Sequence, residues 1–510
     1  MKDNHSNTKR IFKNTIVLYF RMIVTLLITL YTSRIVLKAL GFDDYGLYNV
    51  VGGVVALFAF LKSSMSSSTQ RFLSYEMGKN DGNNLRNVFS VCFSTHLLLA
   101  GILLLIAETI GLWFLNTQIN IPEGREQVAN IIYQFSVASL CFNMISIPYD
   151  ADIVSNERMG YFAFVSIFDA LLKLAIAFVI LNCQSDRLVL YAFLMMCISI
   201  VNLALNWVFC RVKFQETHYK FYWDKSMFKK VFSFSGWTIW GQLAIIGSNQ
   251  GTNILVNIFH SVTANAAMGV GHQVNTALTG LISNFQTAFK PQITKSYASG
   301  DFDYLQTLTY YASKISFFIL FIVSMPVIFN IDWILDVWLD KVPQYANDLC
   351  VVFIVASLCN AVSAPLWMNI FATGNIKSYQ IAMSVAYVVE LVVVYALFKL
   401  GVPIVVGVSM KAVLNFIVIF IRVIYAHKVV ESFSMTGYLK NVVLPVALSA
   451  FATLLIGIPA FSIVDNVLGK IGMSVLIIVA SIAFAFLIGL NKSERQSVRN
   501  IAKKYIKIKK

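Results

Sequence analysis

The chain has 510 residues, of which 58% are hydrophobic and 13% charged, and its formal net charge is +15. Ordinary globular chains contain roughly 25% charged residues, so most of this surface faces a solvent other than water. The composition therefore excludes a series of water-soluble domains and favours a protein embedded in lipid.

About fourteen apolar runs follow one another, each of the length that crosses a bilayer, about 20 residues. We expect helices, because runs such as VLIIVASIAFAFLIGL at 475–490 lack the strict alternation of barrel strands. The first run is too long for a secretory signal and lacks a small-residue cleavage site. The predicted spans are 14–40, 45–71, 87–115, 128–150, 159–181, 188–211, 229–257, 264–290, 304–329, 349–373, 378–398, 403–422, 441–462 and 471–490.

Basic residues predict the orientation of these spans. Most of the 40 Lys and Arg residues lie before the first span, in alternate loops, and after the last span. The positive-inside rule then predicts an even number of spans with both termini in the cytoplasm. The basic tail after residue 490 is expected to bind anionic membrane lipid. One segment placed inside is acidic instead, around Asp150, Asp152 and Glu157.

A faint internal repeat divides the chain. SSMSSSTQRFLSYEMGKND at 63–81 and LISNFQTAFKPQITKSYASGD at 281–301 both lead from a polar helix end into a Tyr-containing segment and a Gly before a polar turn. Transporters are often built from such repeats. We therefore predict an N-lobe at 1–215 with helices 1–6 and a C-lobe at 216–430 with helices 7–12. Residues 431–510 then form helices 13 and 14 and the cytoplasmic tail.

Three spans carry polar stripes. Helix packing is one explanation for the serines, since Ser, Thr and Gly are common between membrane helices, whereas a continuous stripe with His, Gln and Lys favours a water-filled cavity. The stripe of the eighth span has spacings of three and four residues and comprises His272, Thr276, Thr279, Ser283, Gln286 and Lys290. The second span has Lys62, Ser63, Ser66, Ser67 and Gln70, and the seventh has Gln242, Ser248, Asn249 and Gln250.

Charges deep inside spans are costly, at least about 2.5 kcal/mol each at a helix centre, and each needs a partner or water. Asp169 and Lys173 are four residues apart on one helix and are expected to pair. Glu390 and Lys411 lie at similar depths and are also expected to pair in the membrane. Of the basic residues inside the spans, the other three have no evident acidic partner: Arg21, Lys62 and Lys314. We expect them to bind an anion, with Lys290 at the cytoplasmic mouth, although Arg21 and Lys62 are close enough to the inner face to snorkel.

Five short motifs mark helix ends along nearly the whole chain: ALGFDDYGLYNVV at 39–51, TQRFLSYEMGK at 69–79, PYDADIVSNERM at 148–159, KPQITKSYASGD at 290–301 and FATGNIK at 371–377. Together they resemble the bacterial polysaccharide flippases (O-antigen type, Wzx-like) of the multidrug/oligosaccharidyl-lipid/polysaccharide exporter (MOP) superfamily. The resemblance implies two six-helix bundles in a V around a cavity lined by helices 1, 2, 7 and 8. It also implies a polyprenyl-diphosphate-linked oligosaccharide substrate, moved across the bacterial cytoplasmic (inner) membrane by alternating access.

Two other functions are weighed against this one. A cation-coupled multidrug antiporter of the same superfamily is expected to carry unpaired membrane acids, whereas the unpaired excess here is basic. A membrane enzyme of glycan assembly needs catalytic groups in a large outward loop, and the longest such loop holds acids without His or Arg. No metal-spaced cluster, phosphate-binding loop or nucleophile motif occurs, so no cofactor, metal or nucleic-acid partner is expected. Seven cysteines, mostly within spans, predict no disulfide framework.

Overall fold

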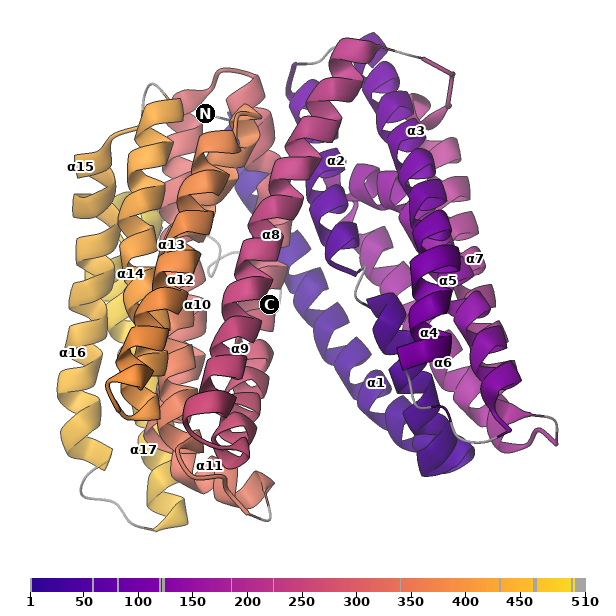
Figure 1. Ribbon diagram of the computed structural model, residues 1–510. Helices are drawn as coiled ribbons and strands as arrows, with labels where there is room; N and C mark the ends of the chain where they lie inside the picture. Colours follow the sequence, from indigo (N-terminus) through magenta and orange to yellow (C-terminus); the bar gives the residue numbers. More distant parts are fainter. Residues whose placement is uncertain are drawn as a thin grey trace, which may run out of the picture. The chain divides into compact units, whose positions relative to one another are not determined.

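The computed structural model describes residues 2–56, 59–79, 82–118, 121, 124–184, 186–222, 224–339, 341–430, 433–461, 466–496 and 499. Over these residues every regular element is a helix and no strand occurs (Figure 1). The predicted all-α fold is therefore confirmed.

The chain divides into two compact units, Met1–Gln242 (unit 1) and Leu243–Lys510 (unit 2). The division falls within the long helix α8 (Lys225–Phe259), later in the chain than the predicted lobe boundary at residue 215. Besides the first half of α8, unit 1 contains α1 (Lys2–Ala56), α2 (Ala59–Lys79), α3 (Gly82–Ile106), α4 (Leu112–Gln118), α5 (Glu126–Ser155), α6 (Met159–Leu181) and α7 (Arg187–Lys213).

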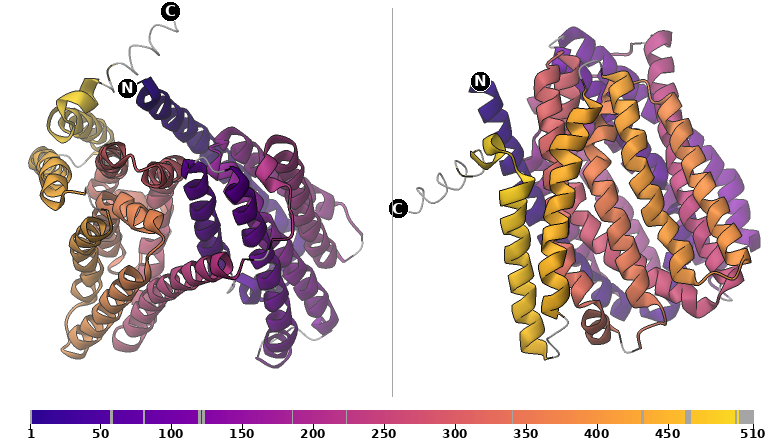
Figure 2. Two further views of the ribbon diagram at one scale, coloured as in Figure 1. Left: turned by 90° about the horizontal axis from the view of Figure 1, so that it is seen from above. Right: turned by 90° about the vertical axis from the view of Figure 1, so that its left-hand side faces the viewer.

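Unit 2 contains the second half of α8 and the helices that follow it. These are α9 (Val262–Ala298), α10 (Phe302–Phe329), α11 (Ile331–Trp338), α12 (Ala346–Thr373), α13 (Lys377–Lys399), α14 (Ile404–Val429), α15 (Met435–Tyr438), α16 (Leu444–Phe461) and α17 (Val467–Phe484). Short π-helical turns connect α3 to α4 and α15 to α16, and another extends α17 to Gly489. In unit 2, α16 and α17 lie side by side at one edge (Figure 2).

The label α1 covers two helices that meet at Gly41, where φ is 78° and ψ is 175°. A positive φ of this size costs a residue with a Cβ atom more than it costs glycine. Residues before Gly41 form the first predicted span, and those after it begin the second, which continues in α2. With this division, each of the predicted spans overlaps a described helix.

Within the described residues, eleven helical segments are long and apolar enough, by length and composition, to cross a membrane. The predicted spans missing from this set are 45–71, 229–257 and 264–290. They are the same three spans that carry the polar stripes. A helix surrounded by lipid needs an apolar surface on every side, so these helices require a neighbour other than lipid on one face.

Other helices differ from these three in how much apolar surface they expose. Large apolar side chains are exposed on α13, among them Val385, Val388 and Val392, as lipid contact requires. The helix α12 is instead largely enclosed by protein, since 67% of its most apolar 18-residue stretch is buried. This helix packs against α9, α10 and α14 and forms the centre of unit 2.

The acidic segment after α5 is a shorter loop than predicted. The helix continues through Pro148 to Ser155, and only residues 156–158 connect it to α6. Arg10 Nε lies 2.6 Å from Glu157 Oε2. Asn206 donates a hydrogen bond of 2.7 Å to Asp150. Groups of unit 1 thus hold these acids, which accounts for an acidic stretch on the side where basic residues are expected.

Candidate functional site

The polar stripe of α9 lies on the open side of that helix. Its apolar side chains, including Ala267, Ile282 and Phe289, are buried, and the helix packs against α10 and α12. Thr276 and Ser283 are exposed, and the other four stripe residues are half-buried. A helix facing lipid would have the reverse arrangement. Unit 2 therefore presents a polar face along α9.

Several stripe residues make contacts inside unit 2. The His272 ring lies 4.3 Å from the Phe353 ring of α12. The Thr276 hydroxyl donates to the His272 carbonyl at 2.8 Å, a bond within the helix that leaves the oxygen able to accept. The Lys290 ammonium lies 5.5 Å from the centroid of the Trp367 ring, a cation–π contact. Gln286 and Ser283 stay available to a ligand at the surface.

In unit 1, α2 uses most of its polar side chains for packing. Gln70 is buried, which places it on the packed face and not on the open one. Ser68 accepts a hydrogen bond of 2.8 Å from Ser235 in the first half of α8. Only Lys62 and Ser63 of the predicted stripe are exposed. Helix packing thus accounts for much of this stripe, and Gln242 on α8 is half-buried.

Arg21 and Lys62 have neighbours within unit 1. The Arg21 guanidinium donates to the Ser166 hydroxyl at 3.3 Å and lies 4.9 Å from the Phe162 ring centroid, both on α6. The exposed Lys62 ammonium is near enough to Asp150 to act on its carboxylate electrostatically, but the two side chains form no ion pair. Lys62 thus has no ion-pair partner among the described residues. Both residues lie near the end of unit 1 that the charge pattern places in the cytoplasm.

The prediction that Lys314 has no acidic partner is wrong. Its side chain is 1% exposed, and Nζ lies 2.6 Å from Glu494 Oε2. The same carboxylate oxygen accepts a hydrogen bond from the Asn491 backbone N–H at 2.7 Å, and Glu494 N–H donates to Asn491 Oδ1. This reciprocal pair is a helix-capping arrangement at the start of the tail. Lys314 is therefore a structural cation.

Asp169 and Lys173 form an ion pair of 2.7 Å on α6, and Asn202 of α7 donates to Asp169 at 2.7 Å. They line a cavity of about 310 Å³ within unit 1. Its walls come from α1, α5, α6 and α7 and include Ser139 and Asn143. Apolar groups form the larger part of its lining, and the Lys173 ammonium already balances its one carboxylate.

Glu390 and Lys411 make no direct ion pair among the described residues, contrary to the prediction. Two consecutive residues of α8 lie between them. Ser248 donates to Glu390 Oε2, and the Lys411 ammonium donates to Asn249 Oδ1 at 2.8 Å. Glu390 is buried, and its Oε1 has no hydrogen-bond partner in the described part of the chain. Glu390 and Lys411 therefore each contact α8 but not one another.

Sequence reasoning missed Arg422, which the predicted span 403–422 places at its end. The helix α14 continues to Val429, so Arg422 lies two turns inside it and is 8% exposed. Lys411, Asn415 and Arg422 are spaced by four and seven residues on one face of α14. That spacing is the signal that would have indicated Arg422 as an intramembrane cation.

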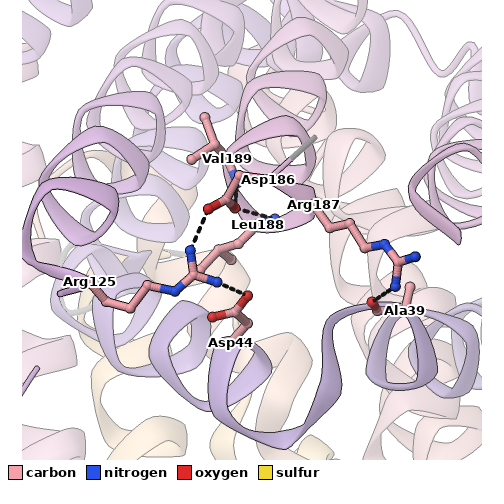
Figure 3. Close-up of polar contacts among 7 residues, drawn as sticks. All are labelled: Ala39, Asp44, Arg125, Asp186, Arg187, Leu188 and Val189. Carbon is pink, nitrogen blue, oxygen red and sulfur yellow. Dashed lines mark hydrogen bonds and ion pairs between the residues drawn. The ribbon is translucent and has the colours of Figure 1, made fainter. Parts of the chain in front are cut away.

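A further charged cluster joins the loops at the predicted outer end of unit 1 (Figure 3). The Arg125 guanidinium lies between Asp44, just after the turn of α1, and Asp186, which caps α7. Arg187 donates to the Ala39 carbonyl at 3.0 Å. Burial acts to lower the pKa of Arg125, but the hydrogen bonds and charges of Asp186 and Asp44 raise it above its ordinary value. Three loops of unit 1 are thus fastened to one another.

No family model and no curated protein matches the chain. The fold, in contrast, is similar to that of solved membrane transporters. One is an outward-facing multidrug resistance MATE family transporter of the MOP superfamily, with 13% identity and a TM-score of 0.69 over 84% of this chain and 97% of the other. A second is the Vibrio cholerae MATE transporter VcmN, with 13% identity and a TM-score of 0.69 over 85% and 99%.

A third similar structure is a MOP superfamily transporter from Pyrococcus furiosus, described by a reverse polarity of its binding pocket that suggests a different function. It has 14% identity and a TM-score of 0.68 over 84% of this chain and 96% of the other. At such identities the similarity shows the fold, that of the MATE transporters. The chain is thus a multi-pass membrane protein with a fold found in the superfamily that its motifs predict.

Proposed function

We propose that this protein is an exporter that moves a polyprenyl-diphosphate-linked oligosaccharide, such as an O-antigen, capsule or exopolysaccharide repeat unit, across the cytoplasmic membrane by alternating access. The charge pattern within the spans carries the proposal. Asp169 is balanced by Lys173, whereas Arg422 bonds only to neutral side chains among the described residues. A diphosphate supplies the negative charge that such a cation requires.

The open face of α9 supports the same substrate class. A glycan presents many hydroxyl groups, and the stripe offers hydroxyl, amide and imidazole groups to bond them. Similar structures are transporters and not enzymes, which supports transport as the activity. We place both termini in the cytoplasm on the charge pattern. The partners are then the lipid-linked substrate, membrane lipids and other membrane proteins of glycan assembly.

A cation-coupled multidrug antiporter of the same superfamily is the second candidate. The similar structures favour it, since they include a multidrug resistance transporter. Glu390 also favours it, because a buried carboxylate oxygen without a partner is suited to binding a proton or a metal cation. Against it, the Lys411 ammonium interacts electrostatically with Glu390 and disfavours a second cation there.

Deletion of the gene in the native organism separates the two functions. The exporter predicts that surface glycan falls while diphosphate-linked oligosaccharide accumulates in the inner leaflet. The antiporter predicts unchanged glycan and greater sensitivity to cationic drugs. The same strain carrying the intact chain is the control, and unchanged glycan in the deletion strain would reject the proposed substrate.

A further inference from the structure

We infer that Arg422 is an anion-binding residue of unit 2, and that it and Lys290 hold the two ends of a diphosphate across one face of α12. The inference rests on the proposed function for the identity of the ligand. It assigns the anion to residues different from the set Arg21, Lys62 and Lys314 that the sequence indicates.

The bonding of Arg422 leaves its charge uncompensated. Nη1 donates to Asn360 Oδ1 at 2.8 Å and to the Ser363 hydroxyl at 2.9 Å, and Nε donates to the Tyr379 hydroxyl at 3.2 Å. All three acceptors are neutral, and Nη2 has no acceptor among the described residues. An arginine in a protein does not lose its proton, so the charge persists when buried. A buried guanidinium held by neutral oxygens is positioned without being neutralised.

Arg422 differs in this respect from three of the cations described above. Lys314 has Glu494, Lys173 has Asp169, and Arg125 has two carboxylates. For Arg422 no carboxylate lies within ion-pair distance in the described parts of the chain. Removing a charge from water without a counter-ion is strongly unfavourable. A ligand anion is the counter-ion that the arrangement lacks.

The face of α12 that Arg422 contacts is open to a ligand at Asn360, whereas Ser363 one turn further along is fully buried. Asn360 is exposed, although the guanidinium that it holds is buried. Asn360, Ser363 and Trp367 follow one another at spacings of three and four residues, which places them on one side of the helix. Seven residues separate the first from the last, about 10 Å along the axis. Trp367 is the residue on whose ring the Lys290 ammonium lies.

The polar stripe of α9 runs beside this face. Ser357 of α12 donates to Asn275 Oδ1 of α9 at 2.7 Å and fixes the two helices at that level. Asn275 is one residue before Thr276 of the stripe. Two cations, an aromatic ring and a row of hydroxyl groups therefore occupy one side of unit 2. A guanidinium binds phosphate oxygens through two parallel N–H donors, and an ammonium binds them as a point charge.

The test is the binding of inorganic pyrophosphate to the full chain in phosphatidylcholine nanodiscs, measured by calorimetry. Arg422→Gln should weaken binding at least about tenfold, the effect of losing a charged hydrogen bond. Arg422→Lys should weaken it less. The matched control is Arg495→Gln, because among the described residues Arg495 bonds only to the Leu487 and Leu490 carbonyls after α17, away from α12.

Asn360→Asp keeps the test decisive if Arg422 variants fold poorly. The new carboxylate would lie beside Nη1 and provide an internal counter-ion, so the variant should be at least as stable as the parent while losing pyrophosphate binding. Unchanged affinity in both Arg422→Gln and Asn360→Asp would overturn the inference. An effect of Arg495→Gln equal to that of Arg422→Gln would do the same.

A lipid headgroup carries the same phosphate chemistry, and nanodiscs of phosphatidylglycerol distinguish the two sources. Unchanged pyrophosphate affinity in the anionic discs supports a diphosphate ligand. Loss of pyrophosphate binding there would assign the site to a headgroup and overturn the diphosphate. These results do not depend on glycan export. If deletion of the gene leaves surface glycan unchanged while Arg422→Gln loses pyrophosphate, the exporter is rejected and the anion site remains.

Discussion

The contact between Lys314 and Glu494 predicts a large energetic coupling between α10 and the start of the tail. Glu494→Gln leaves the ammonium in place, 1% exposed, without an opposite charge. Removing one partner of a buried ion pair costs about 3–5 kcal/mol, and the amide oxygen of Gln, which still accepts a hydrogen bond, places the expected loss near the lower figure. Replacing both partners, Lys314→Met with Glu494→Gln, should return stability to within about 1 kcal/mol of the parent.

Detergent-induced unfolding in mixed micelles, followed by circular dichroism, gives the free energies of the parent, both single variants and the double variant. The coupling energy of this double-mutant cycle should be about 2 kcal/mol or more. The double variant should also export glycan normally, since Lys314 is structural. Additive effects of the two changes, or a Glu494→Gln variant as stable as the parent, would refute the reasoning. Lost export in a stable double variant would return Lys314 to the transport site.

Four further predictions concern other parts of the fold. In a background without native cysteines, Thr276→Cys and Ser283→Cys should react with a polar thiol reagent, whereas Leu278→Cys on the buried face should not. If all three cysteines fail to react, the stripe is not open to water. Asp169→Asn with Lys173→Met should leave export within about twofold of the parent, because the pair is replaced as a whole; lost export would give the pair a transport role. Arg125→Gln should destabilise unit 1 by only about 1 kcal/mol, since its ion pairs are partly exposed, and should speed hydrogen exchange at the start of α7. Gly41→Ala should cost about 1–3 kcal/mol of unfolding free energy, because φ 78° with ψ 175° is a conformation that glycine alone adopts readily, whereas Gly101→Ala within α3 should not.

Apolar runs predicted the helices well, because the length of a span and its backbone hydrogen bonding depend on local sequence. The partners of buried charges depend on contacts between distant segments. Glu494 lies in a basic tail that is expected to bind the membrane surface, so nothing in the local sequence indicates that its side chain contacts Lys314. Glu390 and Lys411 match in depth, but depth does not determine how each helix is rotated, and α8 lies between their side chains. Arg422 was missed because the apolar run ends two turns before the helix does.

The position of the boundary between the units within α8 has a consequence for dividing the gene. A fragment ending in the loop after α7 omits the half-helix whose Phe234 ring lies 5.7 Å from Phe72 and whose Ser235 bonds to Ser68. Such a fragment would leave α2 with an unfilled groove. A fragment ending at Gln242 would instead cut through helical backbone and free four carbonyl groups. Two separately synthesised halves should therefore fail to assemble at either cut, whereas a break in the connection between α14 and α15 interrupts neither helix.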